Sequence, residues 1–361
     1  MRIVVVGASG NVGTAVLRRL TREPAIDAVT GVARRVPGES AGPPYEMVDW
    51  LSLDVGGLDA VDRLADCFTD AAAVIHLAWQ IQPSHDRDRL RRTNVQGTAQ
   101  VAEAAVRARV PALIVASSVG AYAPGPKDRR VGEDWPVTGV PGSTYSRDKA
   151  DVEALLDRVR QRHPTLRIVR LRPGLTFQRT AASQIARFFA GPLAPLSLLR
   201  FGRLPAVPEG SRLRMQAVHA DDVADAYVRA ALSDVDGAFN IVAEPVLDAR
   251  SVTARFGGVP IPVPPGLLRA GAAVTWYGRL QPVEPGWVEL AARCPLLSAQ
   301  RADAELGWRP RLNALDALAE LFDGMAHRAG GATASLRRRP PASVRLAAVL
   351  AGRLPGQGDP Y

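Results

Sequence analysis

A glycine-rich turn close to the start of the chain constrains the fold more than any other feature. The turn GASGNVG spans residues 7–13 and directly follows the apolar, β-branched run IVVV at residues 3–6. Such a run is typical of a buried parallel strand, and the apolar period after the turn predicts a helix from residue 12 to about residue 23. Strand, turn and helix predict the first unit of a dinucleotide-binding fold. The glycines let the backbone approach a pyrophosphate, whose charge is held by free N–H groups of the helix.

The position of this turn is more informative than its pattern. With 32 Gly in 361 residues, the same spacing is expected by chance in roughly a quarter of such chains. Its place between a buried strand and an amphipathic helix favours dinucleotide binding over a turn that only packs a strand on a helix. The residues assigned to the cofactor here are Gly7, Ser9, Gly10, Asn11, Val12 and Gly13.

Strands and helices alternate through the rest of the N-terminal half. Further strands are predicted at residues 28–33, 46–53, 73–78 and 111–116, and helices at residues 58–68, 84–109 and 145–162. This alternation predicts an α/β fold with a doubly wound parallel sheet. Ligands bind such sheets beyond the carboxyl ends of the strands, where a Pro/Gly-rich loop at residues 122–143 is expected to form a lid, a substrate wall or a surface excursion. His76, inside an apolar run, is expected to be a hydrogen-bonded core residue.

The end of the second strand bears on the choice of cofactor. An acidic residue about 20 positions after the glycines would select NAD by accepting from the ribose 2′-hydroxyl. Here Arg34 and Arg35 follow the strand, whereas Asp27 precedes it. Guanidinium groups suit a 2′-phosphate, so NADP is favoured over NAD; ordinary surface arginine is the alternative in a chain this rich in Arg. Asp54 and Val55, after the third strand, are expected beside the adenine.

Composition limits the class of protein. A chain of 361 residues that is 47% hydrophobic can bury a large core and form about two domains. Cys67 and Cys294 have neither a disulfide-framework nor a metal-ligand spacing. Met1 leads directly into the first strand and no apolar run is long enough to span a membrane, so no signal peptide or transmembrane segment is expected. A cytoplasmic location is the expectation.

The positive charge does not indicate a nucleic-acid partner. Of the net +9, the last 31 residues contribute five Arg and one Asp, or +4, and residues 1–330 contribute the remaining +5. No basic helix or stripe interleaved with aromatics accounts for this excess. Residues 329–361 are rich in Gly, Pro and Arg and are expected to be a flexible tail. Its residues 344–354 are expected to be solvated rather than bound to a membrane surface or partner groove.

Tyr145 and Lys149 give the strongest chemical signal. Their spacing places both on one face of a helix. A nearby ammonium and an oxidised nicotinamide would lower the pKa of the phenol from about 10, making it a general base. Ser118, at the end of the preceding strand, would hold the substrate oxygen while Tyr145 exchanges its proton. Six Tyr and two Lys give roughly a 3% chance of this spacing by accident.

These features together resemble the extended short-chain dehydrogenase/reductases, the NAD(P)-dependent epimerase/dehydratase family. The resemblance covers residues 1–325 and implies a Rossmann domain at residues 1–175 with a return near 215–245, and a smaller, discontinuous substrate lobe at 176–214 and 246–328. It implies a homodimer formed through helices 84–109 and 145–162. The landmarks that match are Gly7, Gly10, Gly13, Asp54, His76, Leu77, Ala78, Asn94, Gly97, Thr98, Ser117, Ser118, Tyr145, Lys149, Arg172, Pro173 and the later runs VHADDVA, FNI and ELGWRP.

The resemblance implies roles for several of these residues. Ser118, Tyr145 and Lys149 match the catalytic trio, and Asn94 matches a residue that supports the nicotinamide end. Leu77, Ala78, Pro173, Tyr145 and Lys149 are assigned to cofactor contact, with Lys149 holding the nicotinamide ribose. His219 and Asp221–Asp222 are expected to be structural, with Asp221 or Asp222 as a helix N-cap. No metal site is expected.

Two departures bear on the substrate. Residues 175–178 replace the family's usual Gly-Pro turn, and residues 188–207 are apolar and proline-rich where enzymes acting on nucleotide sugars carry polar and basic groups. The spacing of Arg212 and Arg214 does not match those groups. A hydrophobic carbonyl or hydroxy compound is therefore as credible a substrate as a nucleotide sugar, unless these apolar residues only pack the lobe.

The sequence thus predicts an NAD(P)-dependent oxidoreductase that acts on a small molecule. One alternative is a nucleotide-sugar epimerase or dehydratase with retained NAD. The other is a non-catalytic NAD(P)-binding regulator, although a regulator would not need a general base.

Overall fold

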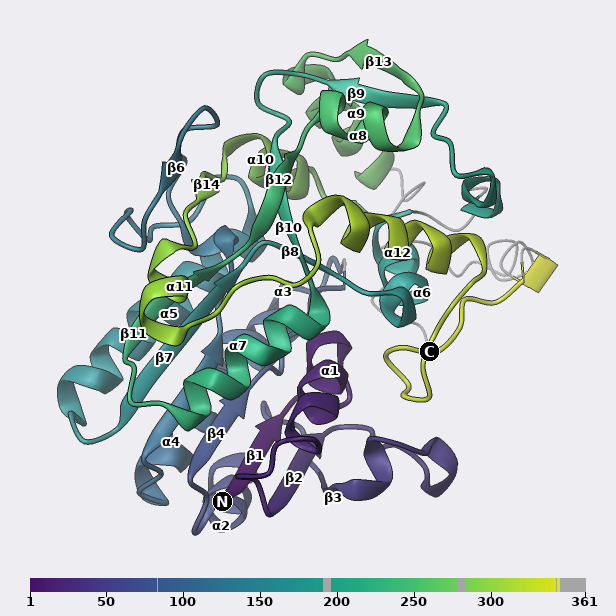
Figure 1. Ribbon diagram of the computed structural model, residues 1–361. Helices are drawn as coiled ribbons and strands as arrows, with labels where there is room; N and C mark the ends of the chain where they lie inside the picture. The colour runs from purple at the N-terminus through teal and green to yellow at the C-terminus, as the bar shows by residue number, and fades with distance from the viewer. Residues whose placement is uncertain (83, 191–195, 278–282, 342, 345–361) are drawn as a thin grey trace.

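A parallel sheet of seven strands forms the centre of the protein (Figure 1). The computed structural model describes residues 1–82, 84–190, 196–277, 283–341 and 343–344. The strands run in the order β11-β7-β5-β4-β1-β2-β3, and every neighbouring pair is parallel. Their bounds are β1 Arg2–Val6, β2 Ala28–Ala33, β3 Asp49–Ser52, β4 Ala73–His76, β5 Ala112–Ala116, β7 Arg167–Pro173 and β11 Gly237–Ile241.

The strand order confirms the predicted doubly wound sheet. From β1 the chain proceeds outward to β2 and β3 on one side, then crosses back to build β4 and β5 on the other. Val4 of β1 is paired with Thr30 on one side and with Val74 on the other. The change of direction at β1 opens a crevice beyond the carboxyl ends of β1 and β4, where such sheets bind ligands. The glycine turn follows β1 at this point.

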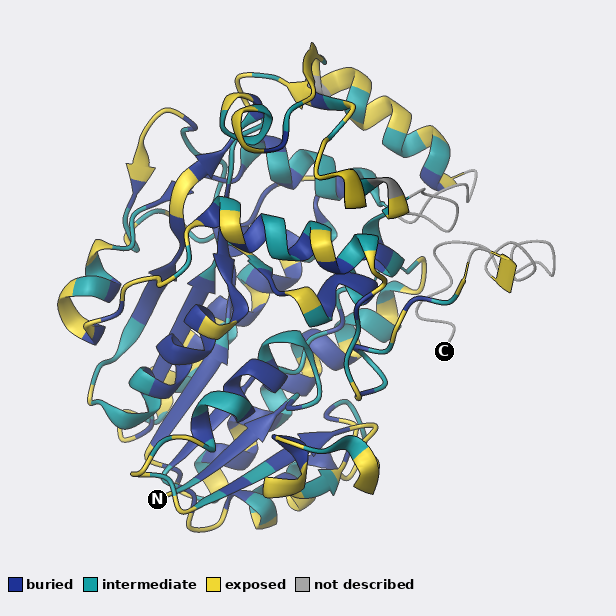
Figure 2. Ribbon diagram, turned by 45° about the vertical axis from the view of Figure 1, so that its right-hand side comes forward, coloured by how far each residue is buried: buried dark blue, intermediate teal, exposed yellow. Residues whose placement is uncertain are grey.

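Helices cover both faces of the sheet, and alternate residues of β1 serve the two cores. Ile3 and Val5 pack in one core with α1 (Asn11–Leu20) and α7 (Ala220–Leu232). Val4 and Val6 pack in the other core, against α2 (Ala60–Phe68), α4 (Gly97–Arg107) and α5 (Thr144–Arg162). Burial on both faces explains why β1 is apolar throughout rather than alternating. Figure 2 shows the sheet as a predominantly dark blue centre between these helix layers.

The remaining elements form smaller sheets and helices, most of which lie above the carboxyl edge of the large sheet, whereas α11 packs beside β11 (Figure 1). A three-stranded sheet combines β8 (Leu175–Phe177), β10 (Met215–His219) and β12 (Ala243–Leu247). Two further pairs are β9 (Ala206–Glu209) with β13 (Val259–Pro262), and β6 (Arg130–Val131) with β14 (Leu296–Leu297). The helices are α6 Ala182–Phe189, α8 Ala249–Phe256, α9 Pro265–Tyr277, α10 Pro285–Arg293, α11 Gln300–Leu306 and α12 Ala314–Ala326. Within the described residues, no helix is both long and apolar enough to cross a bilayer.

Several predicted elements have different bounds. The helix predicted at residues 84–109 is divided into α3 (Arg87–Arg91), a π-helical turn (Arg92–Gln96) and α4. The strand predicted at residues 46–53 is shorter, since a 3₁₀ turn occupies Tyr45–Met47 before β3. Hydrophobic period alone does not reveal an inserted π-turn, because the apolar positions continue on both sides of it.

The N-cap of α7 is His219, not Asp221 or Asp222 as predicted. The His219 Nδ1 atom accepts a hydrogen bond from the backbone N–H of Asp221. Asp222 is buried inside the helix, where its carboxylate accepts from the backbone N–H of Leu312. The helix begins earlier than predicted because an imidazole can satisfy a first-turn N–H as an Asx side chain does.

The first part of the predicted flexible tail is packed. Leu336 and Thr333 are fully buried, and the Arg187 guanidinium donates to the carbonyl oxygens of Ser335 and Arg337, both at 2.7 Å. Composition misses this because one leucine and a few backbone contacts are enough to fix a short turn. Residues 345–361, with most of the segment at 344–354, lie outside the described residues, as do residues 191–195 of the predicted apolar stretch.

Candidate active site

The glycine turn has little room for any larger residue. Gly7 has a φ of +88°, and a Cβ there would lie 2.5 Å from the backbone nitrogen of Ala78, two residues after the end of β4. A Cβ on Gly13 would lie 2.4 Å from the Gly7 carbonyl oxygen. Gly10 is the N-cap of α1 and offers no side chain to its first N–H groups. The turn therefore leaves a helix N-terminus open to an anion, as a bound pyrophosphate requires.

Adding a methyl group at Gly13 is expected to impair cofactor binding. In Gly13→Ala the new Cβ meets backbone atoms of Gly7 and Ala8, so the turn itself must move. We expect dinucleotide affinity to fall by about 100-fold, because misplaced N–H groups lose their phosphate contacts. Titration with the cofactor measures the change. Gly38→Ala is the matched control, since a Cβ there has no atom within 4 Å; equal affinity in both variants would contradict this role for Gly13.

The residues predicted beside the cofactor lie in the glycine turn, at the start of α1 and at the carboxyl ends of β4 and β7. The Leu77 N–H donates to the Val6 carbonyl, which holds the end of β4 next to the turn. Asn11 is tied to the other lobe by Gln178, whose amide donates to its side-chain oxygen at 2.6 Å. Val12 lies at the start of α1, and Ser9 lies within the turn. Pro173 is the last residue of β7 and is paired with Ile241 of β11.

Arg34 and Asp54 meet at the carboxyl edge beside β1. Arg34 is the first residue after β2, and its guanidinium lies 4.0 Å from the Asp54 carboxylate. With its amide oxygen turned toward Arg34, Gln80 accepts from the guanidinium at 3.0 and 3.2 Å. Arg35 is exposed next to it. Val55 is buried and packs against Gly97, where a Cβ would lie 2.7 Å from it.

Asn94 supports the loop that follows β4. Its side chain accepts from the Gln80 N–H at 2.7 Å and donates to the Gln80 carbonyl oxygen at 3.0 Å. Asn94 lies in the π-helical turn, a rare geometry that is frequent at functional sites. His76 is buried and bonded through Nε2 to the Thr98 hydroxyl, and burial lowers its pKa to about 3. His76 is therefore a neutral core residue.

Ser118, Tyr145 and Lys149 converge at the end of β5 and the start of α5. Ser118 follows β5 and caps a 3₁₀ turn by accepting from the Gly120 N–H at 3.0 Å. Its hydroxyl is hydrogen-bonded to Tyr145. Lys149, one helical turn further, donates from Nζ to the Ala116 carbonyl oxygen at 2.7 Å. Side chains from two neighbouring elements therefore come together at this point.

The protonation of this group differs from the sequence-based expectation. Burial raises the pKa of Tyr145 to about 12, with the hydrogen bond from Ser118 acting in the opposite direction. Burial also lowers the pKa of Lys149 to about 7, against the raising effect of the Glu153 and Asp148 charges. The ammonium lies 6.0 Å from the centre of the Tyr145 ring, with its hydrogen bond directed to Ala116. Tyr145 is accordingly a protonated phenol at neutral pH.

Aromatic side chains surround the phenol, and no local pattern in the sequence indicates their convergence. The Lys149 Nζ atom lies 3.3 Å from the centre of the Trp79 ring, a cation–π contact. Trp79 also packs edge-on against Tyr145, with ring centres 5.9 Å apart. Trp287 of α10 lies 4.8 Å from Tyr145, and Phe189 of α6 lies 5.2 Å from Trp287. The site is therefore walled by apolar rings from both lobes.

A buried ionic network lies next to the trio. Glu153, on α5 one turn after Lys149, is 2% exposed and accepts from Arg170, Arg172 and the Ser117 hydroxyl. Burial alone raises the pKa of Glu153, but the hydrogen bonds and charges of the two arginines outweigh it and bring the pKa to about 2. Sequence analysis missed this network, although the i, i+4 spacing from Lys149 and the charges within the buried strand RIVRLRP were available signals.

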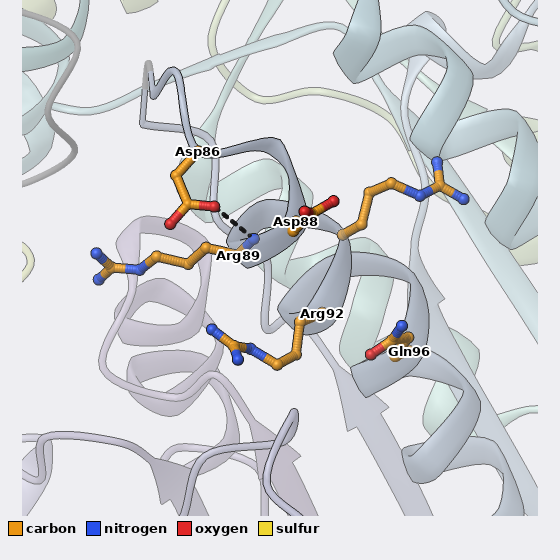
Figure 3. Close-up of a pocket in the computed structure, with 6 residues that line it drawn as sticks. Asp86, Asp88, Arg89, Arg92 and Gln96 are labelled. Carbon is orange, nitrogen blue, oxygen red and sulfur yellow. Dashed lines mark hydrogen bonds between the residues drawn. The ribbon is translucent and has the colours of Figure 1, made fainter.

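Other charged groups do not belong to the site. A surface hollow of about 510 Å³ is lined by side chains of α3 and the π-helical turn, and by none of the predicted site residues (Figure 3). There Asp86 accepts from the Arg89 N–H and caps α3. Among the described residues, no three His, Cys, Asp or Glu side chains are grouped as a metal site would require.

The sequence matches a family model and several known proteins. The family model described as "NAD dependent epimerase/dehydratase family" matches residues 3–241. An uncharacterised protein of Mycobacterium tuberculosis is 23% identical over 327 residues, which cover 89% of this chain and 83% of that protein. The L-arabinose 1-dehydrogenase (NAD(P)(+)) of Haloferax volcanii is 30% identical over 183 residues, 48% of this chain and 66% of its own.

The fold is also found among solved structures. The UDP-glucose 4-epimerase of Thermus thermophilus, in complex with NAD, superposes with a TM-score of 0.66 at 23% identity. The match covers 90% of this chain and 99% of the epimerase. At this level of identity the similarity concerns the fold.

Proposed function

The chain belongs to the NAD dependent epimerase/dehydratase family of enzymes, and from this premise we propose that it transfers a hydride between a nicotinamide cofactor and a carbonyl or hydroxyl carbon. The observation that supports the proposal most directly is the convergence of Ser118, Tyr145 and Lys149 at the carboxyl end of β5, in a sheet whose β1 is followed by an uncapped glycine turn. A non-catalytic regulator would need the turn but not a phenol hydrogen-bonded to a serine.

Each residue of the trio has a separate task. Tyr145, protonated in this environment, donates its proton to the carbonyl oxygen during reduction and accepts it back from the hydroxyl during oxidation. Ser118 hydrogen-bonds the same oxygen and so orients it. Lys149, whose pKa is about 7, adds positive charge near the phenolate that remains after proton donation when its amine is protonated. The glycine turn and Arg34 would hold the dinucleotide, which supplies the hydride when bound.

The substrate we propose is an apolar or aromatic carbonyl or hydroxy compound. Trp79, Trp287 and Phe189 offer apolar faces around the phenol. Arg214 is a basic residue that could bind a diphosphate. Its guanidinium instead donates to the Lys127 carbonyl oxygen at 2.5 Å. A second candidate is epimerisation of a nucleotide sugar with retained NAD, which is supported by the likeness to an NAD-bound UDP-glucose 4-epimerase.

Product analysis separates these candidates. The purified enzyme is incubated with NADPH and a panel of aromatic and aliphatic ketones and aldehydes, and separately with UDP-sugars and NAD. Stoichiometric oxidation of the cofactor with formation of an alcohol supports the oxidoreductase. Isomerisation of a UDP-sugar without net change in the cofactor supports the epimerase. Cofactor binding without any product from either set contradicts both.

We propose NADP as the preferred cofactor because Arg34 and Arg35 follow β2 and no acidic residue occupies that position. NADPH is expected to bind about tenfold or more tightly than NADH, a difference of about 1.4 kcal/mol. The double variant Arg34→Ala/Arg35→Ala should lose this preference, with little change in NADH affinity. Titration of both cofactors measures it, and Arg22→Ala, an exposed arginine near the far end of α1, is the control. A wild-type preference for NADH would contradict the proposal.

A further inference from the structure

The segment after α12 turns back across the protein to the glycine turn. Residues 329–341, which we call the C-terminal strap, follow the end of α12 and run alongside α6 toward the start of α1 (Figure 1). At its start, the Ser183 N–H of α6 donates to the Ala329 carbonyl oxygen at 3.1 Å. At its other end, the Arg339 N–H donates to the Ser183 hydroxyl at 2.9 Å. The strap is thus fixed at both ends to one helix of the smaller lobe.

The middle of the strap is a closed turn with its own core. Leu336 is fully buried, and its backbone is bonded in both directions: its N–H donates to the Thr333 carbonyl and its carbonyl accepts from the Gly331 N–H. A Cβ on Gly330 would lie 2.6 Å from the Leu336 carbonyl oxygen, so the turn requires glycine there. Arg187 of α6 holds the outer side through two backbone carbonyls of the strap. Such a turn has a defined conformation.

One side chain of this turn reaches the glycine turn. The Ser335 hydroxyl donates to the Ser9 carbonyl oxygen at 2.5 Å, joining residues 326 positions apart. This bond uses a carbonyl and leaves the N–H groups at the start of α1 available to a phosphate. The strap therefore links α6 of the smaller lobe to the turn that would hold a pyrophosphate.

We propose that the C-terminal strap is a third part of the dinucleotide site, which fixes the glycine turn from outside and slows release of the cofactor. The inference rests on the proposed function in one respect, that the glycine turn binds a dinucleotide. A ligand whose pyrophosphate lies on this turn would be enclosed by the two lobes and by a segment that must detach, or carry the turn with it, before the ligand leaves. A segment near the C-terminal end of the chain would therefore help to set the rate of cofactor exchange.

The test compares rates of cofactor release in full-length variants. Each protein is loaded with NADPH, mixed with an excess of NADP⁺, and followed by nicotinamide fluorescence. Ser335→Ala removes the bond to Ser9 and should accelerate release by about fivefold, the effect of one hydrogen bond. Ser335→Ala/Leu336→Ala also removes the buried anchor and should accelerate release by about 50-fold. Ser343→Ala, an exposed serine, is the control and should leave the rate unchanged.

The outcomes separate the strap from the proposed function. Faster release of the cofactor in both strap variants supports the proposed role of the strap, provided that the rate of the reaction at Tyr145 with cofactor bound is unchanged. Release at the wild-type rate in Ser335→Ala overturns it, even where the double variant fails to fold. If the wild-type protein binds neither NADPH nor NADP⁺, the proposed function and the proposed role of the strap are both overturned.

Discussion

Tyr145→Phe is expected to lower kcat by about 10³-fold and to leave the dissociation constant of the dinucleotide nearly unchanged. The substitution removes only the phenolic hydroxyl, and general acid–base groups typically contribute about 10²- to 10⁴-fold. The aromatic ring remains, so its contacts with Trp79 and Trp287 are retained. The measurement combines steady-state kinetics on the substrate identified by product analysis with cofactor titration.

The control for this experiment is Tyr277→Phe on α9, which removes an exposed phenol and should leave both quantities unaltered. Parallel loss of binding and turnover in Tyr145→Phe would mean that the phenol has a structural task and that another group exchanges the proton. Full activity in Tyr145→Phe would remove the trio from the mechanism altogether.

Glu153→Gln is expected to destabilise the fold by about 3–5 kcal/mol, because it removes the carboxylate that pairs with the buried Arg172 and leaves Arg170 with the more exposed Asp157 as its remaining counter-ion. Both arginines are about as buried as Glu153 itself. Chemical denaturation of the wild type and the variant measures the difference in the free energy of unfolding. Glu103→Gln, which breaks an exposed i, i+4 pair with Arg107, is the matched control and should leave stability unchanged within error.

The same substitution has a defined pH dependence. The pKa of Glu153 is about 2 in the folded protein and 4.5 ordinarily, so the unfolded chain binds the proton first as the pH falls. The carboxylate therefore contributes its stability above about pH 4.5 and loses it as the pH falls toward 2. The difference in stability between wild type and Glu153→Gln should narrow over this range. A difference that is independent of pH would contradict the assignment of Glu153 as the charged partner.

Local patterns predicted the large sheet well because its strands are buried on both faces. The strand predicted at residues 28–33 is β2 as observed, and the run at residues 3–6 is the apolar part of β1. Tyr145 and Lys149 could be predicted to share a helix face because their spacing is a single turn. Features that depend on contacts within one helix or strand can be predicted from the sequence.

Features that depend on distant segments could not be predicted in the same way. The aromatic wall combines Trp79 after β4, Phe189 on α6 and Trp287 on α10, and no local pattern joins these three. The pKa of Tyr145 follows from burial, which the i, i+4 spacing with Lys149 does not report. The strap was predicted to be flexible because its composition is polar and rich in Gly and Pro, yet the single buried Leu336 and the partners on α6 fix it.

Identification of the bound nucleotide tests the central claim most directly. The purified protein is denatured, any released nucleotide is identified by mass spectrometry, and nucleotide-free protein is titrated with NADP⁺, NADPH, NAD⁺ and NADH. The expected result is saturable binding of one dinucleotide per chain, with NADPH preferred over NADH and strong weakening in Gly13→Ala. Absence of binding by all four dinucleotides would contradict the account, because neither the trio nor the strap has a function here without a cofactor on the glycine turn.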